Sequence, residues 1–224
     1  MRRITVIVFL VALGASESGA QIIRPRQRMP EPRAWASASV GFLQPWTVND
    51  GTTGATWDFG NAVQYRVSFE MPVQNQSTLG VTATLARVPL TYRGWAVAGG
   101  PAFTPCPSGC DADANITQLL ASFHAGGSAI GFHQVIELAA GGTAYSNFRE
   151  RAGGVRLPPS NPDIDFSIAI GYGFGFTLAP AMQITLVQDF ALTMHQRDRL
   201  AGGENALSRQ FTTRLGMRFG LGAQ

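Results

Sequence analysis

The sequence contains no lysine, because all 17 of its basic residues are arginine. Charged residues make up only 14% of the chain, whereas about a quarter is usual for a soluble domain. The formal net charge is +3, and two of the arginines, Arg2 and Arg3, lie in a segment that we expect to be removed. The charge of the mature chain is therefore nearly balanced, and we expect no nucleic-acid partner.

Long apolar runs are also missing beyond the first 20 residues. Arg2 and Arg3 precede an apolar run from Ile4 to Ala15, and small residues follow as far as Ala20. This order predicts a secretory signal peptide over residues 1–20. A helical membrane anchor is the alternative, but the run is well short of the roughly 20 residues that a span needs. A mature chain of this kind can cross a membrane only as a closed β-barrel.

Cysteine is scarce as well. The two cysteines, Cys106 and Cys110, lie close together in the run Pro-Cys-Pro-Ser-Gly-Cys-Asp. In an exported protein this pair predicts a local disulfide. A zinc site is the alternative, but no third or fourth ligand lies nearby and zinc takes four. We therefore expect neither a metal site nor a cofactor.

What the sequence does contain is strict alternation from Ala34 onward, with an apolar, aromatic face and a face of charged or small residues. Such alternation predicts strands. It is strongest over residues 57–71, 164–178, 182–194 and 210–221, and weaker over 34–44, 78–93, 115–125 and 129–149. Residues 116–123 could also form a short helix, but their context favours a strand.

The connections between these eight strands alternate in length. Residues 72–77, 126–128 and 179–181 are short, whereas 45–54, 98–114, 152–163 and 197–206 are long. Short periplasmic turns and long extracellular loops are typical of a transmembrane antiparallel up-and-down β-barrel. Soluble barrels such as lipocalins bury their apolar face inside instead. We therefore expect an all-β chain with a signal peptide at 1–20, a flexible segment at 21–33 and an outer-membrane barrel domain at 34–224.

From Ala34 to its end the chain resembles the eight-stranded outer-membrane barrels of the OmpA and OmpX type. The run from Phe211 to Leu221 is similar to the C-terminal strand that the outer-membrane assembly machinery recognises, although the chain ends in Gly-Ala-Gln and not in an aromatic residue. The resemblance implies a Gram-negative outer membrane, contact with its lipid and lipopolysaccharide, engagement of the assembly machinery, and a monomer.

The face opposite the aromatic one carries the charged residues that we expect to point into the barrel. They are Asp58, Arg66, Glu70, Glu137, Asp189, Arg214 and Arg218, with Arg87 added if a bulge changes its face. They could line a gated polar pore or form an internal salt-bridge network. We favour the network, because an eight-stranded barrel is only wide enough for side chains. Folding the last hairpin about its loop places Asp189 opposite Arg214.

Three further features leave alternatives open. Tyr145-Ser146-Asn147 and the run from Ser160 to Phe166 loosely resemble a region of lipid A deacylases, but Ala144 stands where that family has its histidine. No catalytic residue is therefore assigned to His124, His133 or His195. Trp35, Trp46, Trp57 and Tyr172 could form interfacial girdles or could pack between strands.

The expected function is that of a non-enzymatic outer-membrane barrel that supports envelope integrity or surface interaction through its long loops. A narrow channel for small polar solutes or ions is the first alternative. A lipid A-modifying hydrolase is the second.

Overall fold

The computed structural model describes residues 32–50, 55–74, 76–94, 109–126, 131–159, 161–195 and 206–223. Their secondary structure is almost entirely β: β1 Pro32–Pro45, β2 Val48–Asp50, β3 Ala55–Phe59, β4 Ala62–Gln74, β5 Ser77–Gly94, β6 Cys110–Gly126, β7 Gly131–Glu150, β8 Asp163–Ala179, β9 Met182–His195 and β10 Ala206–Ala223. None of these residues forms a helix that is long and apolar enough to cross a membrane.

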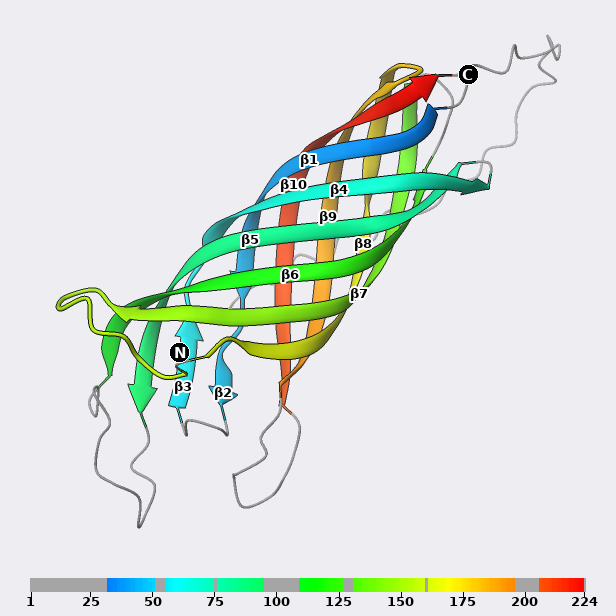
Figure 1. Ribbon diagram of the computed structural model, residues 1–224. Helices are drawn as coiled ribbons and strands as arrows, with labels where there is room; N and C mark the ends of the chain where they lie inside the picture. Colours follow the sequence, from blue (N-terminus) through cyan, green and yellow to red (C-terminus); the bar gives the residue numbers. More distant parts are fainter. Residues whose placement is uncertain are drawn as a thin grey trace, which may run out of the picture.

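Eight of the strands close into one antiparallel barrel (Figure 1). Their order around the barrel is β5-β4-β1-β10-β9-β8-β7-β6, and β6 pairs back onto β5. The prediction of an all-β, eight-stranded up-and-down barrel is confirmed. The connections β4–β5, β6–β7 and β8–β9 lie at one end, which we call the short-turn end, and the other connections define the long-loop end. β1 begins at Pro32, two residues before the expected start of the barrel.

The outer surface of the barrel is apolar on every one of its eight strands. On β4, for example, the outward residues from Val63 to Met71 are about half exposed, whereas the inward residues Gln64 and Glu70 are buried. The stretch from Val63 to Met71 is nine residues long, which is about the length that a tilted strand needs to cross a bilayer. Apolar side chains outside and polar ones inside are the reverse of a soluble barrel and characterise a transmembrane one.

One predicted strand is interrupted. The sequence indicated a single strand over 57–71, but the structure has β3 and β4, separated at Gly60 and Asn61. The backbone N–H of Gly60 donates to the Pro89 carbonyl at 2.7 Å, and the alternation changes phase across this break. Odd-numbered residues point inward on β3 and outward on β4, so that Trp57 is fully buried while Val63 is half exposed.

The change of phase corrects one predicted interior residue. Asp58 is not in the barrel interior but on the outer surface, where its Oδ1 accepts a hydrogen bond from Thr47 Oγ1 at 2.7 Å. The prediction failed because the apolar residues resume in the same parity after the one lapse at Asn61, while the direction of the side chains reverses there.

The strands β2 and β3 form a short hairpin at the long-loop end of the barrel, at the lower end of Figure 1. β3 pairs with the last residues of β5, beyond the part of β5 that pairs with β4. Val48, Ala55, Trp57 and Phe59 of this hairpin are buried. The hairpin therefore extends the barrel wall and directs large apolar side chains into the lumen.

Candidate functional site

The lumen contains two chemically different regions. The first, which we call the charged network, lies from the middle of the barrel toward the short-turn end and consists of Arg66, Glu70, His124, Glu137, Asp189, Arg214 and Arg218. The second is the apolar cluster at the long-loop end, which Figure 1 draws at the bottom. We call it the upper core, because we expect the long-loop end to face outward from the cell. Its largest members are Leu43, Trp57, Tyr92, Ile116, Tyr145, Phe148 and Leu157.

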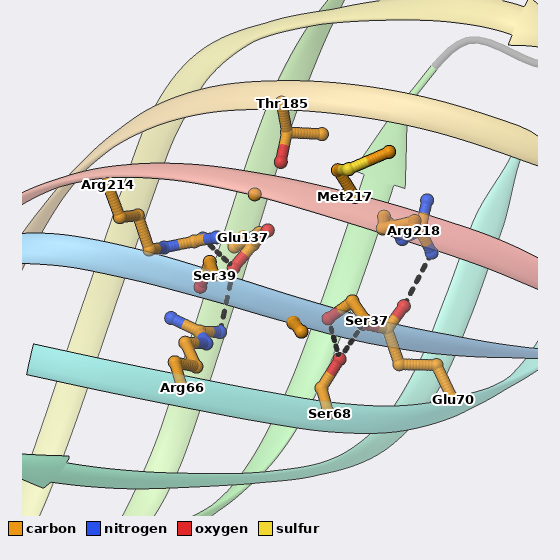
Figure 2. Close-up of a pocket in the computed structure, with 12 residues that line it drawn as sticks. Ser37, Ser39, Arg66, Ser68, Glu70, Glu137, Thr185, Arg214, Met217 and Arg218 are labelled. Atoms are coloured by element: carbon orange, nitrogen blue, oxygen red, sulfur yellow. Dashed lines mark hydrogen bonds and ion pairs between the residues drawn. The ribbon is translucent and has the colours of Figure 1, made fainter.

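Two arginines meet on one glutamate at the centre of the charged network (Figure 2). Arg66 on β4 lies 2.8 Å from the Glu137 carboxylate on β7, and Arg214 on β10 contacts the same oxygen. Arg214 also donates from Nε to Asp189 at 2.6 Å, and Arg66 lies 3.4 Å from Asp189. The predicted pairing of Asp189 with Arg214 is therefore confirmed, and the cluster crosses the lumen from one wall to the other.

The second half of the charged network is centred on Arg218, at the short-turn end. Its Nη2 lies 2.5 Å from the Glu70 carboxylate, and its Nη1 lies 2.9 Å from His124 Nε2. Glu70 also accepts hydrogen bonds from the hydroxyls of Ser68 and Thr78. Charged hydrogen bonds of this length are the stronger kind, so Glu70 and Arg218 fix the positions of β4 and β10 relative to each other.

His124 joins the two halves of the network, a role that the sequence did not reveal. Its Nδ1 lies 3.1 Å from Glu137 while Arg218 lies at its Nε2. Because a guanidinium can only donate, Nε2 accepts and Nδ1 donates. The sequence analysis assigned His124 no catalytic role and gave it no partner. Only the parity of β6, in which Ile116, Leu120 and His124 all point inward, could have indicated its position.

Charge is balanced in this network, because three guanidinium groups face three carboxylates. The polar pocket that these side chains line has a volume of about 10 Å³, about the space of one water molecule. A glycine makes the tight fit possible, because a Cβ on Gly171 of β8 would overlap the Asp189 carboxylate. Six of the seven predicted interior residues thus lie together in the lumen, and Asp58 does not.

A layer of amides and hydroxyls separates the charged network from the upper core. Gln118 accepts from Thr84 at 3.1 Å and donates to Thr143 at 3.1 Å and to Gln210 at 3.2 Å. Gln210 in turn donates to the Tyr145 hydroxyl at 3.3 Å. These side chains come from β5, β6, β7 and β10 and bond to one another across the lumen, so the middle of the barrel is filled as well.

Aromatic rings fill the upper core. Trp57 from the β2–β3 hairpin lies with its ring centroid 4.6 Å from that of Phe148 and 5.7 Å from that of Tyr145, both on β7. Phe59 stacks on Tyr145 at 5.9 Å. Offset and tilted rings at such distances stabilise a core beyond the area that they bury. Trp57 is therefore not a residue of the membrane interface but a plug between opposite walls.

A buried histidine and three carboxylates lie beside this plug. His195, the last residue of β9, places Nδ1 2.6 Å from Asp165 Oδ2 and Nε2 3.4 Å from Asp50 Oδ1. Asp163 lies 3.8 Å from Nδ1, and the His195 ring is 5.3 Å from that of Trp57. The sequence held a signal for part of this group, because Asp165 and His195 are equally distant from the turn at Pro180.

The remaining predicted residues have varied positions. Arg87 points outward and lies 3.1 Å from Asp113. Trp35 is buried in the lumen, where Arg218 lies over its ring, whereas Trp46 and Tyr172 are half exposed on the outer face.

Cys110 begins β6, but Cys106 lies outside the described residues, so the disulfide stays a prediction. The signal peptide and residues 21–31 also lie outside them.

Comparison with known proteins gives a fold but no family. No protein-family model matches the sequence, and no curated protein matches it either. Among solved structures, Neisserial surface protein A matches with a TM-score of 0.52 at 9% identity, over 84% of this chain and 97% of that one. The N-terminal β-barrel domain of Pseudomonas aeruginosa OprF has a TM-score of 0.41 at 12% identity, over 84% of this chain and 98% of its own.

A third structure, the attachment invasion locus protein Ail of Yersinia pestis, has a TM-score of 0.39 at 16% identity, over 84% of this chain and 99% of its own. At these identities, structural similarity establishes the fold alone. Together with the closed ring of eight antiparallel strands, the match shows that this chain has the fold of the eight-stranded outer-membrane β-barrels.

Proposed function

We propose that this protein is a non-enzymatic, non-conducting barrel of the outer membrane, and that it supports envelope integrity or surface interaction as a rigid scaffold for its long loops. The observation that carries the proposal is the filled lumen. From the short-turn end to the long-loop end the inward side chains form a charged network, an amide and hydroxyl layer and an aromatic core, each bonded or packed across the barrel.

A narrow channel is the competing function, and the filling of the lumen argues against it. An ion needs a continuous path lined by mobile water or by weak binding groups. Here the pocket that the charged network lines has room for about one water molecule. Above it, Trp57, Tyr145 and Phe148 are fully buried against one another. Opening a path would require breaking paired charges and a packed core together.

The outer surface supports a place in the outer leaflet. Asp113 on β6 accepts hydrogen bonds from Arg87 at 3.1 Å and from Arg151 at 2.7 Å, and both arginines are half or more exposed on the outside of the barrel near the long-loop end. Exposed guanidinium groups bind phosphate well. We infer that this surface contacts phosphate groups of lipopolysaccharide, while the apolar belt below it contacts acyl chains.

The hydrolase alternative draws less support from the described residues. Ser146 takes the outward position next to Tyr145, whose ring points into the lumen. His195 contacts carboxylates and aromatic rings inside the barrel. A serine nucleophile needs its base within hydrogen-bond reach, and these two side chains point to opposite faces of the wall.

The test is planar-bilayer conductance of the refolded mature protein, with a sixteen-stranded porin refolded in the same detergent as the positive control. The proposal predicts no steady conductance above that of the bare bilayer under conditions in which the porin gives discrete steps. Reproducible unitary steps that scale with the amount of folded barrel would contradict the proposal and favour the channel.

Location can be tested separately. We expect the protein to fractionate with the outer membrane of its host and to migrate faster unboiled than boiled in a denaturing gel, as stable membrane barrels do. Recovery as a soluble periplasmic monomer would show that the apolar belt does not meet lipid and would end the proposal.

A further inference from the structure

We propose that Asp50, Asp163 and His195 form a binding site for one divalent transition-metal cation, with Zn²⁺ as the best match, at the long-loop end of the barrel. The three residues come from three elements: Asp50 from the β2–β3 hairpin, Asp163 from the start of β8 and His195 from the end of β9. A cation held there would fasten the hairpin that carries Trp57 to the opposite barrel wall.

The first observation is the convergence of donor atoms. One ligand atom from each of the three residues lies within 4.8 Å of the others. His195 and Asp50 are fully buried, and the Asp163 side chain is 30% exposed. The three therefore surround one small volume that is closed on two sides and open on the third, where Asp163 offers a route of entry for a cation.

The second observation is the orientation of the imidazole. Asp165 lies 2.6 Å from His195 Nδ1 and so holds the proton on that nitrogen. Nε2 is buried and has no hydrogen-bond partner among the described residues. Instead it faces the Asp50 carboxylate, an acceptor, at 3.4 Å. A lone pair and a carboxylate repel each other, so a cation must lie between them, and this cation is either a proton on Nε2 or a metal ion.

The distance itself fits a shared cation. An N–H···O hydrogen bond is usually about 2.7–3.2 Å long, so 3.4 Å is long for a direct bond. Two ligands of one tetrahedral Zn²⁺, each bound at about 2.0–2.1 Å, lie about 3.4 Å apart. Nε2 and Asp50 Oδ1 have this separation.

The charge of the site points in the same direction. Three carboxylates, Asp50, Asp163 and Asp165, lie around a single imidazole, so the described groups form a site that attracts cations. Buried charges need partners, and the charged network below satisfies this requirement with equal numbers of both signs. A divalent cation at the long-loop end would be held by these carboxylates and the imidazole together.

The donor set selects the metal class. One imidazole nitrogen with two carboxylate oxygens suits Zn²⁺ and its neighbours among the first-row metals, whereas Ca²⁺ takes six to eight oxygens and no nitrogen. Asp165 would be the outer carboxylate that orients the histidine, an arrangement common around zinc. A solvent molecule would complete the coordination, because three protein ligands leave the fourth position open.

The experiment uses the untagged mature chain, refolded in detergent and stripped with EDTA, and titrates it with Zn²⁺ by calorimetry. We expect one saturable site per chain, and visible absorption bands of Co²⁺ that indicate nitrogen and oxygen ligands in a four- or five-coordinate site. Asp50→Asn and His195→Gln should each weaken Zn²⁺ binding more than about tenfold, and Asp165→Asn about 10- to 100-fold. Ca²⁺ should not compete.

Two matched variants serve as controls. Asp58→Asn removes an exposed carboxylate from the same hairpin, and His133→Gln removes a histidine at the other end of the barrel, so both should bind Zn²⁺ as the parent does. Faster migration of the unboiled protein reports folding for every variant. Should a buried substitution prevent folding, Asp163→Asn changes a partly exposed ligand and should fold while losing the Co²⁺ bands.

Three results would overturn the proposal. The first is a folded parent chain that binds neither Zn²⁺ nor Co²⁺ saturably. The second is binding that Asp50→Asn, Asp163→Asn and His195→Gln leave unchanged. The third is binding lost equally in Asp58→Asn or His133→Gln. The first of these would mean that a proton, and not a metal, neutralises the cluster.

Discussion

The two ends of the lumen bury ionisable groups in opposite ways. In the charged network three arginines face three carboxylates, and every one of the six lies in an ion pair. At the long-loop end three aspartates share one histidine beside a core of aromatic rings. The first region is complete with protein groups alone, whereas the second is where we propose an added cation. The balanced network therefore acts in structure, and the aspartate-rich end is the place to test for a ligand.

The position of each region explains the difference. The charged network lies within the part of the barrel whose outer face is apolar, and no bulk water can compensate an unpaired charge there. The upper core extends beyond this belt, where the β2–β3 hairpin adds Trp57 and Phe59 to the lumen. Packing holds that end closed, and the aspartate-rich cluster lies at its edge.

Glu137→Leu should have the largest effect on stability. It removes the carboxylate that Arg66, Arg214 and His124 share, and it leaves two buried guanidinium groups with Asp189 as their one remaining carboxylate. We expect a loss of about 5 kcal/mol in the free energy of unfolding, measured by urea titration in detergent or lipid. A loss below about 1 kcal/mol would show that the network does not hold the barrel.

Trp57→Ala should cost somewhat less, about 3–4 kcal/mol, because it empties the centre of the upper core without stranding a charge. Trp46→Ala is the matched control. Trp46 is half exposed on the outer face, over Arg209, and its loss should cost about 1 kcal/mol or less. The same urea titration compares the two. Equal effects of both substitutions would mean that the hairpin does not plug the lumen.

Gly171→Ala should cost about 1–3 kcal/mol, because the added methyl group meets the Asp189 carboxylate and also lies 3.0 Å from Val187. Gly142→Ala places its methyl group at an ordinary 3.6 Å from Ile164 and should be nearly neutral. A thermal melt of the folded barrel, followed by the unboiled band on a gel, ranks the two. The interior would be looser than described if Gly171→Ala were as stable as the parent.

Asp113→Asn should have the smallest effect, about 0–1 kcal/mol. Asp113 pairs with two arginines, Arg87 and Arg151, as Glu137 does, but on the outside of the barrel and with both guanidinium groups half or more exposed. Water and salt screen such pairs. The urea titration used for Glu137→Leu gives the comparison, and a cost near that of the buried substitution would contradict the role of burial.

Much of the fold could be predicted from the sequence, because the outer and inner faces of a barrel strand lie in different environments and are formed by alternate residues. Runs such as Phe166, Ile168 and Ile170 must meet lipid while Ser167 and Ala169 face inward, and no other arrangement satisfies both. Six of the network residues followed from this parity, and the pairing of Asp189 with Arg214 followed from the length of the last loop.

The rest could not be predicted because it depends on where the alternation is interrupted. Asn61 is a polar residue at a position where the alternation calls for an apolar one, but a single lapse does not show that the inward face reverses there, so Asp58 was placed inside and Trp57 outside. His124 meets Glu137 on the neighbouring strand β7 but Arg218 on β10, and Asp50 meets His195 on β9. The contacts of His124 with Arg218 and of Asp50 with His195 come from closing the barrel, and the pairing of neighbouring strands does not reveal them.

The central claim is that the charged network is mutually paired, and a double-mutant cycle on Asp189 and Arg214 tests it most directly. Asp189→Leu leaves one excess positive charge in the lumen and Arg214→Leu leaves one excess negative charge, and each should cost about 3–5 kcal/mol of unfolding free energy.

The double variant retains Arg66 with Glu137, which lie 2.8 Å apart, and so restores the balance. We therefore predict that Asp189→Leu with Arg214→Leu together costs less than either single change, in urea titrations of the folded barrel. Costs that simply add, or single changes that are neutral, would show that the two residues do not interact and would contradict the account of a filled and charge-balanced lumen.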